Sequence, residues 1–285
     1  MNYKIFVLIT ILFLMGAGFL LTSKEKVEKE ISVKKETKVE LELEEKQVPE
    51  ITLISVYDNY QVNPELKTAW GFGLIIETPN EKILFDTGGD SEILLNNMKK
   101  LGIAPKSIDK IVISHIHGDH VGGLEGFLKE NSKVTVFIPS SFPDSIRNMI
   151  KNYGADFIEV SDPIKISDFI FSTGELYGPP KEQSLVINSK KGLIVITGCA
   201  HPGIVNIVKK AKEMFPKEKV YLVLGGFHLL RASDSELKGI IENFKKLGVQ
   251  KVAPCHCSGN RCRELFKKEY QNDFIENGVG KIIKI

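Results

Sequence analysis

Short apolar runs alternate with longer amphipathic segments through most of the chain after residue 50. The run Lys82–Phe85 ends in a glycine turn, as a buried strand does. In the segment 235–247 the apolar residues recur at helical spacing, and Gly248 follows as a stop signal. The same criteria predict strands at residues 110–114, 133–138, 170–172, 184–188, 193–197, 220–224 and 249–253, and helices at 142–153, 204–214 and 261–270. This alternation predicts sheets covered by helices in an α/β layered domain.

The first fifty residues have a different pattern. Ile5–Leu21 is an almost unbroken apolar run of 17 residues preceded by Lys4, and a membrane-spanning helix needs about 20 residues. A cleaved signal peptide is the alternative, but no small-residue cleavage site follows the run, so an uncleaved anchor is favoured. Residues 23–50 alternate Lys and Glu without an aromatic residue or a glycine. They predict a solvated tether, or a transient charged helix, because they bury too little apolar surface to order.

The predicted organisation is therefore a membrane anchor or signal segment at 1–22, a charged flexible tether at 23–50 and one globular domain at 51–285. The short flank that contains Lys4 is expected inside the cell, which places the globular domain outside the cytoplasm. The chain is thus expected to be anchored to a membrane or exported.

Charge and cysteine content narrow the function classes. The net charge is +2, and the globular part has no basic block interleaved with aromatic residues. A nucleic-acid partner is therefore not expected. The thiols of Cys199, Cys255, Cys257 and Cys262 all lie close to histidine segments, which argues against a disulfide framework. They are either small buried thiols or neighbours of a functional site.

All six histidines fall in four short segments, at His115-Ile116-His117-Gly118-Asp119-His120, His201, His228 and His256. Each segment follows the last apolar residues of a predicted strand, so rigid elements would hold the side chains outside the core. Buried imidazoles and carboxylates are costly without partners, and they are the ligands that suit zinc, iron or manganese. The pattern predicts a metal-dependent enzyme.

The first histidine segment has the spacing of a two-ion site. His115 and His117 alternate on an extended turn and would bind one ion, while Asp119 and His120 would turn towards a second. Two ions about 3.5–4 Å apart lower the pKa of a bridging water and so supply hydroxide at neutral pH. The glycines that follow at 122 and 123 allow the backbone to bend tightly.

Residues 114–123, Ser-His-Ile-His-Gly-Asp-His-Val-Gly-Gly, resemble the signature of the metallo-β-lactamase superfamily. The resemblance implies a four-layer αββα sandwich over nearly all of 51–285, preceded here by the apolar N-terminal helix, with a one- or two-metal site at one edge. Residues 86–89 match the family's aspartate turn, where Asp86 would orient a ligand histidine. Segments 197–206, 225–229 and 256–259 are similar to the subgroup that includes the archaeal dihydropterin ribofuranosylaminobenzene phosphate synthases.

The resemblance also implies a ligand set of five histidines with aspartates. His115, His117, His120 and Asp119 come from the first segment, and His201 and His256 are the better candidates for the remaining places. His228 is then left to contact substrate or to act as a general acid or base. The chain departs from the family at 197–200, where the usual bridging aspartate is missing. Either Cys199 ligates, or the bridge is hydroxide alone, and this puts the second metal in doubt.

Glu182 and the segment at residues 70–73 lie outside the histidine segments. Glu182 is expected in a solvated loop rather than in the pocket. The segment Trp70-Gly71-Phe72-Gly73 is expected in core packing more than at the opening of the site.

The favoured function is a metal-dependent hydrolase or related transferase. It would act on a small anionic substrate through a metal-bound hydroxide, with Asp119 and His228 as catalytic residues. The expected cofactor is one or two divalent transition metals, zinc foremost, with manganese or iron as alternatives. The alternatives are a hydrolase of β-lactams, lactones or phosphodiesters with the same fold, and a non-catalytic metal or ligand sensor on a membrane tether.

Overall fold

The computed structural model describes residues 49–285. The predicted anchor at 1–22 and nearly all of the predicted tether lie outside the described residues, as does the predicted N-terminal apolar helix. Within 49–285 no helix is long and apolar enough to cross a membrane.

One sheet has seven strands in the order β13-β1-β2-β3-β4-β5-β6. Strands β3 to β6 run parallel to one another, whereas β1 pairs antiparallel with both β2 and β13. The strands are β1 (Thr52–Tyr57), β2 (Gly73–Glu77), β3 (Lys82–Phe85), β4 (Lys110–Val112), β5 (Thr135–Pro139), β6 (Asp156–Val160) and β13 (Ile282–Lys284).

The second sheet has six strands in the order β12-β11-β10-β9-β8-β7. Strands β10, β11 and β12 are parallel, and the remaining pairs are antiparallel. The strands are β7 (Ile164–Ser167), β8 (Ile170–Ser172), β9 (Leu185–Ser189), β10 (Gly192–Thr197), β11 (Val220–Gly226) and β12 (Lys251–Cys255).

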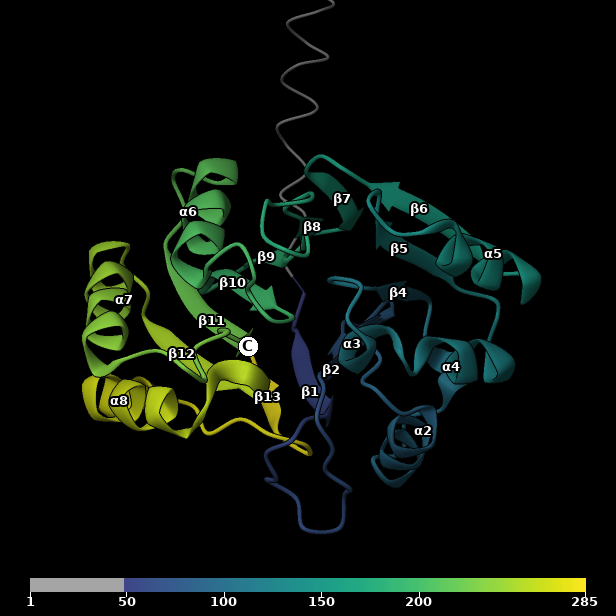
Figure 1. The fold of residues 1–285 in the computed structure, drawn as a ribbon, viewed down its shortest axis with the longest axis horizontal. Coiled ribbons are helices and arrows are strands. Elements are labelled where there is room, and N and C mark those ends of the chain that lie inside the picture. Colours follow the sequence, from purple (N-terminus) through teal and green to yellow (C-terminus); the bar gives the residue numbers. More distant parts are fainter. Residues whose placement is uncertain (1–48) are drawn as a thin grey trace, which may run out of the picture. The chain divides into compact units, whose positions relative to one another are not determined.

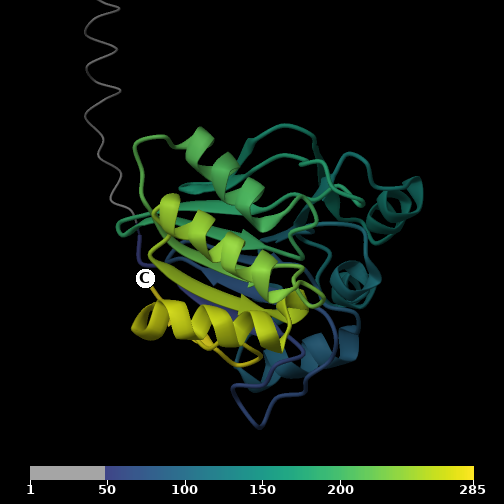
Figure 2. The ribbon, with the colours of Figure 1, turned by 60° about the vertical axis from the view of Figure 1, so that its left-hand side comes forward.

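Helices cover the outer face of each sheet (Figures 1 and 2). The first sheet carries α2 (Ser91–Lys100), α3 (Gly118–Val121), α4 (Leu124–Glu130) and α5 (Asp144–Asn152), and the second carries α6 (Ile204–Met214), α7 (Asp234–Lys246) and α8 (Asn260–Tyr270). Helix α7 begins with a reciprocal capping box, because Ser233 accepts from the Glu236 N–H while the Glu236 carboxylate accepts from the Ser233 N–H.

Successive residues of the strands enter different layers of the core. Ile194 and Ile196 of β10 pack between the sheets with Leu74 of β2, whereas Val195 packs against the outer helices with Ile207 of α6. Strands buried on both faces therefore read as continuous apolar runs. The layers follow the order helix, sheet, sheet, helix, so the predicted α/β architecture with two sheets is confirmed for the described residues.

This architecture brings the functional segments together. The parallel strands β3 and β4 end at the same edge of one sheet, as β10, β11 and β12 do in the other. A backbone hydrogen bond from the Gln183 N–H to the Ser114 carbonyl joins the two sheets at this edge. The residues that follow these five strands include every histidine of the chain.

Candidate metal centre

The first histidine segment turns from β4 into the short helix α3. His115 lies in the turn, His117 is the residue before the helix, and Asp119 and His120 lie within it. Gly123 makes the turn compact, because a Cβ there would lie 2.2 Å from the Thr87 carbonyl oxygen. The α3 backbone can thus approach the turn after β3 closely, as the two glycines of the motif predicted.

His115, His117 and His201 form one group of possible metal ligands. Their three ligand atoms lie within 4.8 Å of one another. Nε2 of His115 lies 3.1 Å from Nδ1 of His117. Nε2 of His201 is buried and has no hydrogen-bond partner. Three converging imidazoles, one of them with a buried and unpartnered nitrogen, are costly unless a cation lies between them.

The second group contains Asp119, His120, His256 and Cys199. His256 comes directly after β12, and its Nε2 lies 3.2 Å from Nε2 of His120 and 3.3 Å from Oδ2 of Asp119. The Sγ atom of Cys199 lies 3.2 Å from Nε2 of His120. The Cys199 thiol therefore belongs to the second group of possible ligands. The sequence alone leaves open whether this thiol binds a metal.

Hydrogen bonds on the far side of each ring fix which nitrogen faces the groups. Nδ1 of His120 lies 2.7 Å from Oδ2 of Asp86, and Nδ1 of His256 lies 3.0 Å from Oδ1 of Asn59. The Ser114 hydroxyl donates to Asp86 and so accepts from Nδ1 of His115. In its neutral form each of these three rings therefore carries its proton on Nδ1 and presents the Nε2 lone pair to the group, as metal ligands require. Asp86 thus contacts the imidazole of His120, a candidate ligand, and fixes the orientation of its ring.

The electrostatics of the first group favour neutral imidazoles. Burial and the neighbouring histidines hold the pKa of His115 well below its usual range. Burial, with His228 and His117 nearby, lowers the pKa of His201 to about 4. Burial also lowers the pKa of His117. Neutral imidazoles are the form that binds a metal, so this donor set fits a transition-metal ion.

The second group lies in a negative environment. Burial opposes charge on Asp119, but the nearby imidazoles of His256 and His120 hold the pKa of its carboxyl well below the usual range. Asp86 outweighs the effect of burial on His120 and raises the pKa of that imidazole to about 9. The carboxylates of Asp86 and Asp119 thus favour positive charge in the second group, which suits a second cation.

Glu182 is buried and holds the loop after β10, so the expectation of a solvated loop residue was wrong. Its Oε1 accepts hydrogen bonds from the N–H groups of Gly198, Cys199 and Ala200 at 2.9–3.1 Å, and its Oε2 accepts from the His201 N–H at 2.8 Å. Burial raises the pKa of Glu182 to about 6, against these four bonds. One carboxylate therefore sets the backbone that carries two possible ligands, Cys199 and His201.

His228 lies at the mouth of the centre. Its ring is exposed and its centroid lies 4.4 Å from that of His201. His228 also offers a possible metal-ligand atom that lies within 4.8 Å of those of Cys199 and His201. A hydrogen bond with the Cys257 thiol raises the pKa of His228.

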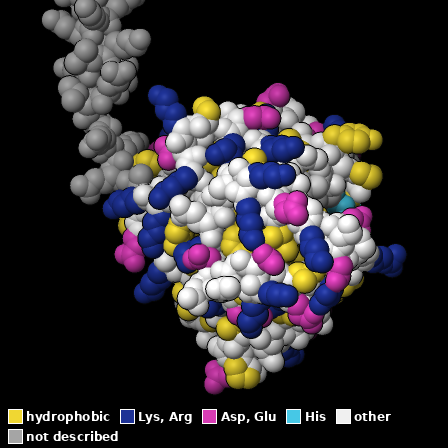
Figure 3. Space-filling view, turned by 90° about the vertical axis from the view of Figure 1, so that its left-hand side faces the viewer, with side chains coloured by type: hydrophobic (Ala, Val, Ile, Leu, Met, Phe, Trp, Pro, Cys, Tyr) yellow, Lys and Arg dark blue, Asp and Glu magenta, His cyan; other side chains and the backbone are white. Residues whose placement is uncertain are grey.

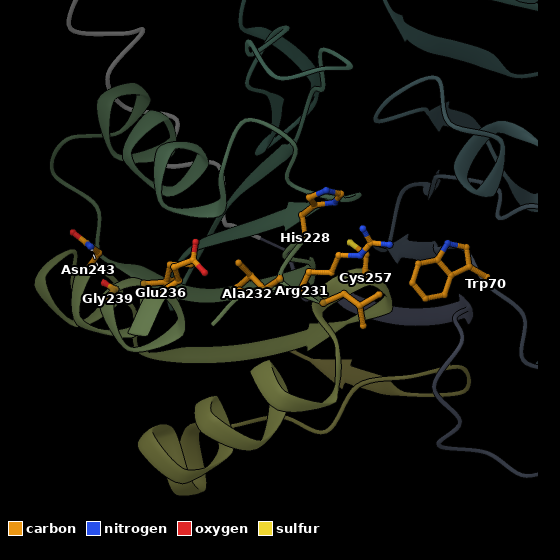
Figure 4. A pocket seen from close by; sticks show the side chains of 11 residues that line it. Trp70, His228, Arg231, Ala232, Glu236, Gly239, Asn243 and Cys257 are labelled. Carbon is orange, nitrogen blue, oxygen red and sulfur yellow. Dashed lines mark hydrogen bonds between the residues drawn. The ribbon is translucent and has the colours of Figure 1, made fainter. Parts of the chain in front are cut away.

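A cavity opens outwards from His228, with Trp70, Arg231 and Cys257 around it (Figure 4). Trp70 is 50 % exposed, and its ring centroid lies 4.8 Å from that of His256. The expectation of core packing for residues 70–73 is therefore wrong for Trp70 and confirmed for Phe72, which is buried in the core.

The comparisons with known proteins agree with this geometry. The family model of the metallo-beta-lactamase superfamily matches residues 72–208. The chain is 35 % identical over 281 residues to the 7,8-dihydropterin-6-methyl-4-(beta-D-ribofuranosyl)-aminobenzene-5'-phosphate synthase of Methanocaldococcus jannaschii, covering 82 % of this chain and 95 % of the relative. The chain belongs to the metallo-β-lactamase superfamily.

Other members of the superfamily are similar over different lengths. A crystal structure of a metal-dependent hydrolase of the β-lactamase superfamily superimposes with a TM-score of 0.72 and 29 % identity, covering 82 % of this chain and 99 % of that one. The ribonuclease Z of Pediococcus pentosaceus is 29 % identical over 163 residues, which are 52 % of this chain and 49 % of the relative. The likeness to the hydrolase thus extends over nearly all of the described domain.

Proposed function

We propose that this protein is a metal-dependent hydrolase or a related transferase that acts on a small anionic substrate. The observation that carries the proposal is the convergence of three imidazoles, one of which has a buried nitrogen without a hydrogen-bond partner. This nitrogen is Nε2 of His201, a residue that groups with His115 and His117. A packed core without a bound cation gives no reason for this arrangement.

The ligands divide between two ions. His115, His117 and His201 would hold one, and Asp119, His120 and His256 would hold the other, with Cys199 in the place of the family's aspartate. Zinc suits this mixture of imidazole, carboxylate and thiolate, and manganese and iron are the alternatives. When bound, such ions lower the pKa of water and polarise the bond under attack.

The chain's own residues would move the protons. Oδ2 of Asp119 accepts a proton from the attacking water while the water oxygen forms a bond to the phosphorus or carbonyl carbon of the substrate. The bond to the leaving group then breaks, and the exposed imidazole of His228 supplies a proton to the departing oxygen. In a transferase an alcohol or amine replaces the water, and the same two proton transfers apply.

Charge and similarity both support a small anion as substrate. On the face formed by α6, α7 and α8, Lys and Arg side chains are interspersed with Asp and Glu (Figure 3). Several of them are paired, as in Arg261 with Asp234 and Lys245 with Glu269. Such a face offers no continuous basic track for a polynucleotide. The M. jannaschii relative is named for a product that is a phosphate ester, and the proposal extends that class to this chain.

Metal content and substrate range test the proposal together. Full-length protein purified without chelators should carry one or two transition-metal ions per chain by elemental analysis. It should hydrolyse at least one of a panel of phosphodiesters, thioesters, lactones and β-lactams, and the class that reacts separates the alternatives of the same fold. Metal-free protein would overturn the metal centre. A metal-loaded protein that turns over nothing, but changes its metal content with a ligand, would favour a sensor.

We also propose that residues 1–22 anchor the enzyme to a membrane with the catalytic domain outside the cytoplasm. The apolar run Ile5–Leu21 behind Lys4 supports this location. Protease added to intact cells should then remove the domain. Protection until lysis would reverse the proposed topology.

A further inference from the structure

A groove runs from the metal centre along helix α7. It has a volume of about 650 Å³ and is bounded near the centre by His228 and Cys257, and further out by Gly239 and Asn243. Figure 4 shows Asn243 and Gly239 on α7, with Arg231 and Cys257 beyond the start of this helix and His228 above them. A volume of this size holds an organic molecule rather than a bare anion. We call it the α7 groove.

Gly239 lies in the interior of α7 and borders this groove. A Cβ placed on Gly239 would meet no other atom within 4 Å, so no close contact requires a glycine there. Its φ is also not positive, so the backbone does not require one. Glycine within a helix is destabilising relative to alanine. The residue therefore keeps space open in the groove at a cost to the helix.

Arg231 gives the groove a positive charge close to the metal ligands. Among the described residues its side chain has no ion pair or hydrogen-bond partner. Its guanidinium points to the end of the groove where His228, Cys257 and Trp70 lie (Figure 4). Glu236 also lines the groove, but its carboxylate is bound to the N–H and hydroxyl of Ser233. The guanidinium is thus available to an anion from outside.

The remaining walls are apolar. Leu229, Leu230, Ala232 and Ile240 line the groove beside Trp70. Leu230 is 57 % exposed and Trp70 50 %, and both are among the few large apolar side chains of the described residues that solvent reaches. Exposed apolar side chains gathered around one cavity mark a binding site.

We propose that the α7 groove binds the substrate of the metal centre, with Arg231 holding its anionic group beside His228 and an apolar arm lying along Ile240 as far as Gly239. The substrate class is an organic phosphate, phosphonate or carboxylate whose apolar arm is several carbon atoms long. A single available cation and apolar walls fit such a molecule and not a polynucleotide, which needs repeated cationic contacts. This inference rests on the proposed function, because the anion beside Arg231 is the one that reaches the metal ligands.

Two phosphonates with the same anion test the groove. Methylphosphonate and 4-phenylbutylphosphonate are titrated into zinc-loaded full-length protein by calorimetry. The longer ligand should bind at least tenfold tighter, because its arm buries apolar surface against α7. Gly239→Phe fills the groove and should remove this preference, while the affinity for methylphosphonate stays as in the wild type.

Lys238→Phe is the matched control, because it adds the same ring to α7 one residue away, on an exposed side chain outside the groove. It should keep the tenfold preference. Arg231→Gln should weaken both ligands at least tenfold with unchanged zinc content, and this variant tests the site even where Gly239→Phe fails to fold.

Equal affinity of the two phosphonates for the wild type, or equal behaviour of Gly239→Phe and Lys238→Phe, would overturn the groove as the substrate site. Failure of the proposed function has a different signature. The protein would then hold no metal or hydrolyse nothing, whatever the phosphonates do.

Discussion

Oδ2 of Asp86 lies 2.7 Å from Nδ1 of His120, and both side chains are fully buried. The same carboxylate accepts hydrogen bonds from the N–H and hydroxyl of Ser114, each at 2.7 Å. Asp86 therefore links the turn after β3 to Ser114, which supports His115, and to the candidate ligand His120. The proton it holds on Nδ1 of His120 decides which nitrogen of that ring faces the second group of ligands.

Replacing Asp86 with Asn should remove the second metal and leave the first. The Asn side chain has nearly the same shape, and Asn tolerates the positive φ of 59° at this position. Its amide N–H₂ would face Nδ1 of His120 and move the ring proton to Nε2, where it blocks a metal. Elemental analysis should show one ion per chain, with affinity for the second reduced roughly 10–100-fold.

Asp90→Asn is the control for this variant. Asp90 caps helix α2 by accepting from the N–H groups of Glu92 and Ile93, and Asn caps a helix equally well. This control should keep both ions. Two ions of unchanged affinity in Asp86→Asn would show that Asp86 does not set the tautomer of His120.

Replacing Glu182 with Gln should weaken the first metal site through the backbone. The Gln oxygen can keep the bonds to Gly198, Cys199 and Ala200, but its N–H₂ would oppose the His201 N–H, and an unpaired buried donor costs about 1–3 kcal/mol. We expect a lower thermal midpoint and weaker binding of the ion held by His201. Glu242→Gln, on the exposed side of α7, should change neither. A midpoint and metal affinity equal to the wild type would remove the loop-holding role of Glu182.

The clustering of the candidate metal ligands could be predicted because their signal is local. His115, His117, Asp119 and His120 lie within six residues of sequence, and the ends of parallel strands meet at one edge of a sheet. Helix α6 was predicted with its observed bounds for a similar reason, since its apolar positions and its turns are local. The structure adds that His201 completes the first group and His256 the second.

Partners distant in sequence could not be predicted. Glu182 contacts its loop across 16–19 residues, and Asn59 reaches His256 across 197 residues. Neither contact leaves a pattern in the chain. Strand β6 was also not predicted, because this edge strand is mostly solvent-exposed and carries Asp156 and Glu159 in place of a continuous apolar run.

Cobalt substitution should show whether Cys199 is a ligand. If its sulfur binds the second ion, the cobalt(II) protein should have an intense near-ultraviolet band from thiolate-to-metal charge transfer. Cys199→Ser should lose this band, whereas Cys262→Ser, at a buried thiol of the helix core, should keep it. A band that survives Cys199→Ser would assign the sulfur contact to another residue. If the wild-type cobalt protein lacks the band, the second ion has imidazole and carboxylate ligands alone.

Replacing His228 with Ala should slow turnover without loss of metal. His228 is exposed at the mouth of the centre, and its hydrogen bond with Cys257 raises the pKa of its imidazole, which favours the protonated form that an acid requires. Loss of a general acid lowers the rate about 10²–10⁴-fold for a leaving group that needs a proton. A substrate whose leaving group departs as a stable anion should be much less affected. His117→Ala is the comparison, because it removes a ligand and should lose both metal and turnover for either substrate. Loss of metal from His228→Ala would instead make His228 a ligand and reopen the assignment of His201.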